Sequence, residues 1–135
     1  MDQSRNIELA QQFIARISQG ADPDTITSLF SVDAVLEIPG DVGVLPWIGQ
    51  KTGRQAIADF IRATRTMTEI LTFDIDDIVA SDARAVVVGE LASRIIATGK
   101  VVETAIAIIL TISDELIVRF QMLEDSFAVS RAARG

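Results

Sequence analysis

The predominant spacing of apolar residues changes near Leu71, and that change constrains the fold more than any other feature. Before Leu71 apolar residues recur three or four positions apart, as Ile7, Ala10 and Ile14 do, which is typical of amphipathic helices. After Leu71 they alternate with polar residues, which is typical of strands. This order predicts an α+β fold of the arrangement ααβαββββ, in which three helices cover one face of a curved antiparallel sheet.

Capping signals delimit the first two helices. The first amphipathic stretch ends near Gly20. Asp22 then precedes Pro23, which predicts an N-cap followed by a proline at the first helical position. The second helix should be short and reach Phe30.

A strand and a loop lead to the third helix. The strand is predicted over residues 34–38, and the loop after it carries the only tryptophan, Trp47. Thr52 with Gln55 three residues later predicts a capping box. Ile57 and neighbouring apolar residues should form the buried face of the helix that follows.

The second half of the chain reads as consecutive strands joined by tight turns. A long strand is predicted over residues 84–97, with Thr98-Gly99 as a two-residue hairpin turn. That turn would set Arg94 opposite Glu103 on the facing strand, where the pair contributes ~1 kcal/mol or less. The last strand is predicted over residues 116–124.

Composition excludes several classes of protein. A chain of 135 residues fits one domain, residues 1–135, with a core that needs neither disulfides nor a structural metal. The net charge of −7 argues against nucleic acid and anionic membranes as partners. The longest aliphatic run, residues 105–110, is far shorter than the ~20 residues of a membrane span, so a soluble, cytoplasmic protein is expected.

The residue types that are missing also limit the chemistry. The chain has no histidine, cysteine or tyrosine, which removes the commonest general base, the thiol nucleophile and the phenolic acid. Asp74, Asp76 and Asp77 fall on both faces of a strand, so they indicate a solvated edge rather than a metal cluster. No cofactor or metal is therefore expected.

Five motifs together resemble one known family over nearly the whole chain. They are a strand ending in Glu37-Ile38-Pro39, Trp47-Ile48-Gly49 with Gly53-Arg54, Ala97 to Lys100, Ile117 to Phe120, and Glu124-Asp125. The chain resembles the SnoaL-like and ketosteroid-isomerase-like proteins of the nuclear transport factor 2 superfamily. The resemblance implies a cone-shaped domain that encloses an apolar pocket, usually in a dimer. The family hosts enzymes, ligand binders and dimerisation modules, so the fold does not choose a function.

The chain departs from the enzymes of that family at their catalytic positions. Ketosteroid isomerases use a carboxylate base, a tyrosine and a protonated aspartic acid. The corresponding positions here are Ile38, Phe13 and Ile108, so no appreciable steroid isomerase activity is expected. The carboxylates of limonene-epoxide-hydrolase-like members likewise fall on Met122 and near Ser93.

Strand alternation predicts the lining of the pocket. If Ile108 faces inward, its neighbours on the same and adjacent strands face inward with it. These are Thr104, Ile106 and Leu110, then Leu91 and Ser93, and finally Phe120, Met122 and Glu124. Such a cavity suits a small hydrophobic or aromatic ligand better than a sugar or phosphate.

Three of the candidate residues have both a functional and a structural interpretation. Glu124 at the end of an apolar strand face should have a raised pKa and could act as a base, or it is an exposed carboxylate at the rim. Asp125 could reach the pocket mouth, or it caps a short segment over residues 127–134. Trp47 could be a lid that stacks on the ligand, or an anchor for its loop.

Three functions remain open at this point. The first is an acid–base enzyme of isomerase, cyclase or hydrolase type, with Glu124 or Asp125 as the base. The second is a non-catalytic binder of a hydrophobic molecule, and the third is a dimeric adaptor module. A homodimer is expected because both faces of the strand over residues 105–110 are apolar. The outer face would carry Ala105, Ala107 and Ile109, with Val87 and Ile95 nearby.

Overall fold

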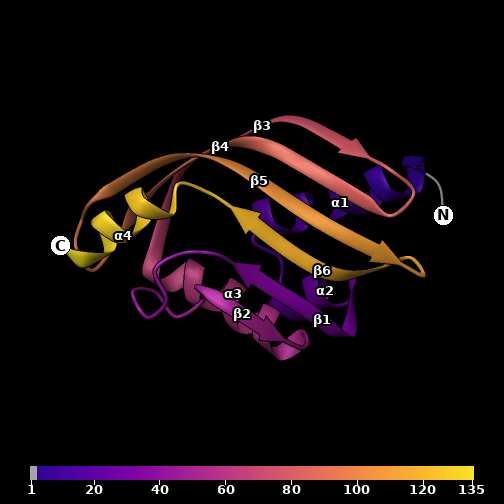
Figure 1. Cartoon of the computed structure of the whole chain (residues 1–135), viewed down its shortest axis with the longest axis horizontal. Coiled ribbons are helices and arrows are strands. Elements are labelled where there is room, and N and C mark those ends of the chain that lie inside the picture. Colours follow the sequence, from indigo (N-terminus) through magenta and orange to yellow (C-terminus); the bar gives the residue numbers. More distant parts are fainter. Residues whose placement is uncertain (1–2) are drawn as a thin grey trace.

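A computed structural model of the chain describes residues 3–135 and contains helices and strands in the order ααββαββββα (Figure 1). The elements are α1 (Gln3–Ser18), α2 (Pro23–Thr27), β1 (Phe30–Ile38), β2 (Gly49–Thr52), α3 (Arg54–Met67), β3 (Thr68–Ala80), β4 (Arg84–Ile95), β5 (Val101–Ser113), β6 (Leu116–Leu123) and α4 (Ser126–Arg134). The α+β class is confirmed. The short β2 and the C-terminal α4 add to the predicted arrangement.

The strands form one six-stranded curved sheet in the order β2-β1-β6-β5-β4-β3. Its pairs are antiparallel except one, because β1 runs parallel to β6, with Leu36 opposite Phe120. The sheet is therefore mixed rather than wholly antiparallel as predicted. The first and last strands lie side by side in the sheet, so segments far apart in the chain pair directly (Figure 1).

Bulges in the edge strand β3 accompany the curvature of the sheet. The register of β3 against β4 shifts between Ile70 and Thr72 and again between Ile75 and Asp77. Beside the second bulge, a Cβ atom on Gly89 would overlap the carbonyl oxygen of Asp74. Bulges bend a strand and increase its twist, and glycine permits the close approach of the two backbones here.

The predicted N-cap of α2 is confirmed. The Asp22 carboxylate accepts a hydrogen bond from the Asp24 backbone N–H at 2.9 Å, and Pro23 is the first helical residue. The helix ends at Thr27, so Phe30 begins β1 instead of closing α2. Strand β1 therefore begins at Phe30, four residues earlier than predicted.

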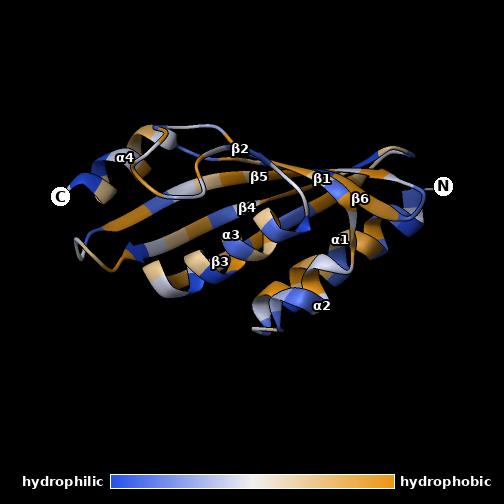
Figure 2. Cartoon of the chain, turned by 90° about the horizontal axis from the view of Figure 1, so that it is seen from below, coloured by the Kyte–Doolittle hydropathy of each residue, from blue (hydrophilic) through white to orange (hydrophobic). Residues whose placement is uncertain are grey.

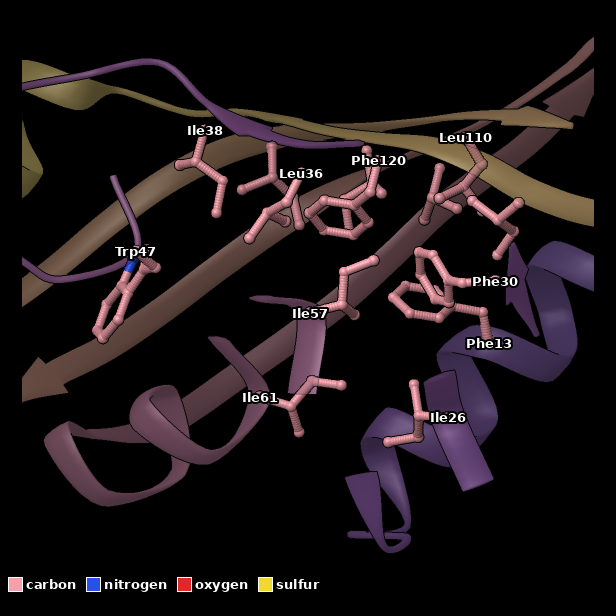
Figure 3. Packing of buried hydrophobic residues seen from close by; sticks show 14 of the residues in the cluster. Phe13, Ile26, Phe30, Leu36, Ile38, Trp47, Ile57, Ile61, Leu110 and Phe120 are labelled. Carbon is pink, nitrogen blue, oxygen red and sulfur yellow. The ribbon is translucent and has the colours of Figure 1, made fainter. Parts of the chain in front are cut away.

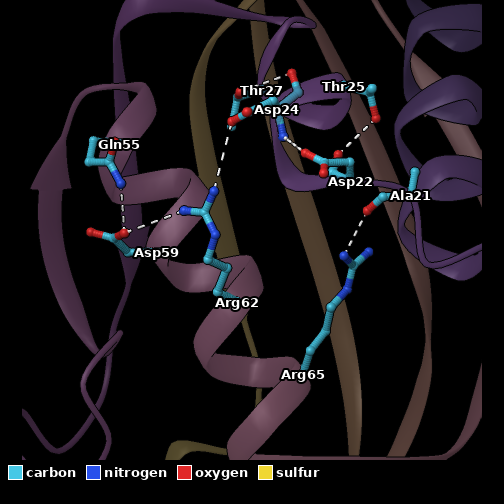
Figure 4. A network of polar contacts seen from close by, with 9 residues as sticks. All are labelled: Ala21, Asp22, Asp24, Thr25, Thr27, Gln55, Asp59, Arg62 and Arg65. Atoms are coloured by element: carbon cyan, nitrogen blue, oxygen red, sulfur yellow. Dashed lines mark hydrogen bonds and ion pairs between the residues drawn. The ribbon is translucent and has the colours of Figure 1, made fainter.

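The predicted capping box at the start of α3 is wrong. The N-cap is Gly53 with a φ of 106°, and no side chain caps the helix. Thr52 belongs to β2, which pairs with β1, and the Gln55 amide donates to Asp59 at 2.8 Å (Figure 4). A positive φ is open to glycine, so the turn from strand to helix uses Gly53.

Polar contacts join α3 to the region around α2. Arg62 lies 3.8 Å from carboxylate oxygens of both Asp24 and Asp59, and Arg65 donates to the carbonyl oxygen of Ala21 at 2.7 Å (Figure 4). These exposed contacts are individually weak. They fix the outer side of the helical layer, while its apolar side faces the sheet.

The hairpin between β4 and β5 differs from the prediction. The Ile95 N–H donates to the Lys100 carbonyl at 2.9 Å, so residues 96–99 form the turn instead of 98–99 alone. The register places Glu103 opposite Ala92 and Arg94 opposite Val101, and Arg94 pairs with Glu69 of β3. The expected pair of Arg94 with Glu103 is therefore not formed.

The core lies between the concave face of the sheet and the helices. Helices α1, α2 and α3 lie on one side of the sheet (Figure 2), where α1 packs against β3 and β4 and α3 packs against β1 and β3. Phe13 of α1 makes edge-on contacts with Phe30 and Phe120 at centroid distances of 5.6 and 5.7 Å (Figure 3). No helix among residues 3–135 is both long enough and apolar enough to span a membrane.

Candidate functional site

A cavity of about 130 Å³ lies between the concave face of the sheet, α1, α3 and α4. Its walls are mostly aliphatic and aromatic. They comprise Phe13, Ile14, Ile17, Leu45, Trp47, Phe60, Ile61, Thr64, Thr68, Ile70, Phe73, Leu91, Ser93, Ile95, Val102, Ile106, Ile108, Phe120, Met122, Glu124 and Val129. A cavity of comparable size, roughly 150 Å³, accepts benzene in an engineered protein, so this one has room for a ring.

Glu124 is the one titratable residue in the lining, counted over residues 3–135. It directly follows β6, and alternation along that strand puts it on the same face as Phe120 and Met122. Ala107 of β5 lies opposite Leu123 in an antiparallel pair. Glu124, one residue later, therefore lies beside Ile106. The carboxylate thus enters the cavity over a floor of apolar side chains.

The carboxylate of Glu124 is half-buried and has no hydrogen-bond or ion-pair partner within the part of the chain that the structure describes. Burial raises the pKa of Glu124 from 4.5 to about 7, because the ionised form loses hydration and gains no compensating contact. At neutral pH the Glu124 carboxyl is therefore protonated in part of the molecules, where it can donate a hydrogen bond. In the others it is ionised and can accept a proton. A pKa near the working pH is what a general base requires.

Aromatic rings form a connected row along the cavity. Trp47 is only 6% exposed and packs edge-on against Phe60 at 6.2 Å, and Phe60 contacts Phe120 at 5.7 Å. Phe120 in turn contacts Phe13. Trp47 is therefore a buried anchor for the loop before β2 and at the same time part of the cavity wall (Figure 3).

Comparison with known proteins agrees with this geometry. A model of the SnoaL-like domain matches residues 10–120. The chain belongs to the SnoaL-like domain family. No curated protein gives a significant match.

Solved structures share the whole architecture of this SnoaL-like domain. An NTF2-like protein of Burkholderia xenovorans LB400 is 24% identical, with 98% of each chain covered and a TM-score of 0.88. Bal32a, from a soil-derived mobile gene cassette, is 20% identical over 99% of this chain and 100% of its own, with a TM-score of 0.85. TerC, co-crystallised with polyporic acid, is 19% identical over 97% and 99%, with a TM-score of 0.82. At these identities the likeness establishes the NTF2-like fold.

Most residues predicted to line the pocket of this SnoaL-like domain do line its cavity. They are Phe13, Trp47, Leu91, Ser93, Ile106, Ile108, Phe120, Met122 and Glu124. Ile38 and Leu110 do not, because both are fully buried in the core. A role of the lining residues in binding remains a prediction.

Thr104 and Asp125 also lie outside the lining, and both serve the start of α4. The Asp125 carboxylate accepts from the Ala128 N–H at 3.0 Å, and its own backbone N–H donates to the Thr104 hydroxyl at 2.7 Å. The structure therefore agrees with the capping interpretation of Asp125. Its exposed carboxylate is not placed to act in the cavity.

Helix α4 closes one end of the cavity, which sequence reasoning did not foresee. Val129 contributes to the lining. Asp41, in the loop after β1, accepts hydrogen bonds from Ser130 and Arg134, both at 2.6 Å, and these contacts lower the pKa of Asp41, chiefly through Ser130. The Asp125 cap was the only signal for this helix in the sequence.

The lining residues missed from the helices follow a recognisable pattern. Ile14 and Ile17 of α1 and Phe60 and Ile61 of α3 belong to the apolar stripes that predicted those helices. The stripes indicated burial but not which part faces a cavity. No group of three or more metal-binding side chains occurs among residues 3–135, and Asp74, Asp76 and Asp77 lie exposed on the edge strand.

The raised pKa of Glu124 has a measurable effect on stability. A carboxyl that titrates near 7 when folded and near 4.5 when unfolded keeps its proton longer in the folded state, so its contribution is full below pH 4.5 and is lost as the pH rises through 7. Relative to Glu124→Gln, the unsubstituted protein should lose as much as about 3 kcal/mol between pH 4.5 and 8. Urea unfolding across this range measures the difference.

The exposed Glu103→Gln provides the matched control for that comparison. Its unfolding profile should run parallel to that of the unsubstituted protein. If Glu124→Gln runs parallel as well, the carboxylate is solvated and the rim interpretation holds.

Proposed function

We propose that this SnoaL-like domain binds a small, neutral, hydrophobic molecule in the cavity and that Glu124 exchanges a proton with it. The observation that carries the proposal is the unpartnered Glu124 carboxylate in an otherwise apolar cavity, with its pKa raised to about 7. Burying a carboxylate without a partner lowers the stability of the folded state. Such an unfavourable group is typical of a functional site, where a ligand contacts it.

The charge of the lining supports a neutral ligand. Over residues 3–135 the cavity wall contains no arginine or lysine. An anionic ligand would find no counter-charge there and would meet the ionised form of Glu124. The aromatic row from Trp47 to Phe13 provides flat apolar contact for a ring-containing body.

Proton transfer is the chemistry that these residues support best. The ionised Glu124 carboxylate can accept a proton from an acidic C–H or O–H group of the ligand. The resulting carboxylic acid can then donate that proton back to the ligand. The apolar walls exclude water from the exchange. TerC, which shares the fold, was co-crystallised with polyporic acid, which supports a small organic molecule as the occupant of such a domain.

A matched pair of probes tests binding and chemistry together. 2-Tetralone is neutral and has acidic C–H groups beside its carbonyl, whereas 2-naphthoate has a similar ring system and a negative charge. We expect 2-tetralone to raise the melting temperature and 2-naphthoate to leave it unchanged at pH 8. In D₂O the protein should accelerate exchange of the acidic hydrogens of 2-tetralone, and Glu124→Gln should lower that rate by ~100-fold or more.

The same measurements separate the competing functions. Binding of 2-tetralone with exchange equally fast in Glu124→Gln would indicate a binder in which Glu124 carries no proton. Preference for 2-naphthoate would contradict the neutral-ligand proposal. An exchange rate that rises with pH and levels off above about 7 supports Glu124 as the base, since only its ionised form accepts a proton.

The convex face of the sheet favours a homodimer as the functional unit. The register aligns Val88, Ala107 and Leu123 across three strands, and places Val86 beside Ile109. Val88 and Leu123 are 39% and 42% exposed. The prediction that Val87 and Ile95 lie near this face is wrong, because both are buried on the concave side.

Charged residues on this face support a second copy of the chain as its cover. Glu37 accepts from Arg119 and from Gln121, each at 2.7 Å, and these hydrogen bonds, that of Arg119 first, lower the pKa of Glu37. The face therefore presents an apolar strip beside groups of both signs. A twofold axis places like surfaces against each other, so such a strip can meet its own copy.

Ile109→Asp tests the dimer. A charge placed in the apolar strip should convert the protein to a monomer in sedimentation velocity at micromolar concentration. Val42→Asp, at a loop position that is 72% exposed, should leave the association unchanged. A monomer for the unsubstituted protein would contradict the proposal.

A further inference from the structure

Ser93 presents an uncommitted hydroxyl to the cavity. It lies on β4, is only 6% exposed, and belongs to the lining. Within the described part of the chain its hydroxyl makes no hydrogen bond. Buried hydroxyls usually have a partner, because leaving one unpaired loses the hydrogen bonds that water would supply.

The other hydroxyls in and near the cavity are already engaged. Thr64 donates to the carbonyl oxygen of Ile61 at 3.0 Å, and Thr68 donates to that of Thr64 at 2.6 Å. Thr104 donates to the carbonyl oxygen of Ala105 and accepts from Asp125. Ser93 thus differs from its neighbours in having no structural use for its hydroxyl.

Ser93 and Glu124 lie at separate places on the concave face. Ser93 is opposite Val102 on β5, whereas Glu124 continues the register beside Ile106, four residues further along that strand. With two strand spacings between β4 and β6, a flat sheet would separate their Cα atoms by roughly 16 Å, and curvature shortens the distance between the side chains. The lining between them is apolar, with Leu91, Val102 and Ile106 among its residues.

We propose that Ser93 is a positioning residue whose hydroxyl donates to an oxygen at the end of the ligand remote from Glu124. This inference rests on the proposed function and narrows the ligand class. The ligand is an elongated neutral molecule with an apolar ring-containing middle and an oxygen at each end. One end contacts the proton-exchanging carboxylate of Glu124, and the other accepts a hydrogen bond from Ser93. The two contacts together fix the orientation of the ligand in the cavity.

Two probes that differ in one oxygen test the contact. 6-Hydroxy-2-tetralone carries a hydroxyl at the end opposite the carbonyl, and 2-tetralone lacks it. In calorimetric titrations we expect the added hydroxyl to improve the affinity of the unsubstituted protein by about tenfold. Ser93→Ala should abolish this gain while its affinity for 2-tetralone stays within about twofold.

A matched variant and a second readout exclude a structural role for Ser93. Thr64→Val removes a hydroxyl from the same cavity, but one that is bonded within α3, so the gain from the added hydroxyl should persist. The melting temperature of free Ser93→Ala should equal or exceed that of the unsubstituted protein, because the hydroxyl has no internal partner to lose.

The outcomes for Ser93 and for the proposed function are distinguishable. If both probes bind and Ser93→Ala retains the gain from the added hydroxyl, the role of Ser93 is refuted and the binding proposal stands. A lower melting temperature of free Ser93→Ala also counts against it, since it shows a structural hydrogen bond. If neither probe binds the unsubstituted protein, the proposed function and this inference fall together.

Discussion

The apolar concave face of the sheet is the constraint on which the rest of this structure depends. A curved sheet with one apolar face must be covered, and α1 and α3 cover it through the aromatic contacts of Phe13, Phe60 and Phe120. Between these helices and the sheet a space of about 130 Å³ remains. The cavity lies in that space, with α4 and the Trp47 loop at its boundary.

The surroundings of three carboxylates shift their pKa values in opposite directions and so assign them different roles. Glu37 has its pKa lowered by hydrogen bonds from Arg119 and Gln121, and Asp41 has its pKa lowered by Ser130 and Arg134. Both groups connect elements and stay ionised. Glu124 has burial without a partner, so its pKa rises, and it is the carboxylate with which proton exchange at neutral pH is feasible.

Local sequence patterns predicted much of the fold because local physics decides it. The Asp22 cap, the stripes of α1 and α3 and the alternation after Leu71 depend on nearby residues, and each matches an observed element. The parallel pairing of β1 with β6 joins segments far apart in the chain, so no local pattern encodes it. The Thr52 capping box was a valid local signal, but pairing of β2 with β1 holds Thr52 in a strand.

The candidate site was predictable where alternation alone decides orientation. Alternation along β4, β5 and β6 placed Ser93, Ile108 and Glu124 correctly on the concave face. It could not exclude Thr104, which is covered because its hydroxyl receives the backbone N–H at the start of α4. Nor could it include Val129, whose position depends on the contacts of α4 with Asp41.

Titration of the Glu124 side-chain carboxyl by ¹³C NMR shows directly whether this group is buried in the cavity and keeps its proton to near-neutral pH. The resonance is identified by its loss in Glu124→Gln, and its chemical shift is followed from pH 3 to 9. We expect a midpoint near 7, set by burial in the apolar cavity. A midpoint at the ordinary value near 4.5 would contradict it, because the carboxylate would then be solvated and its proton lost well below neutral pH.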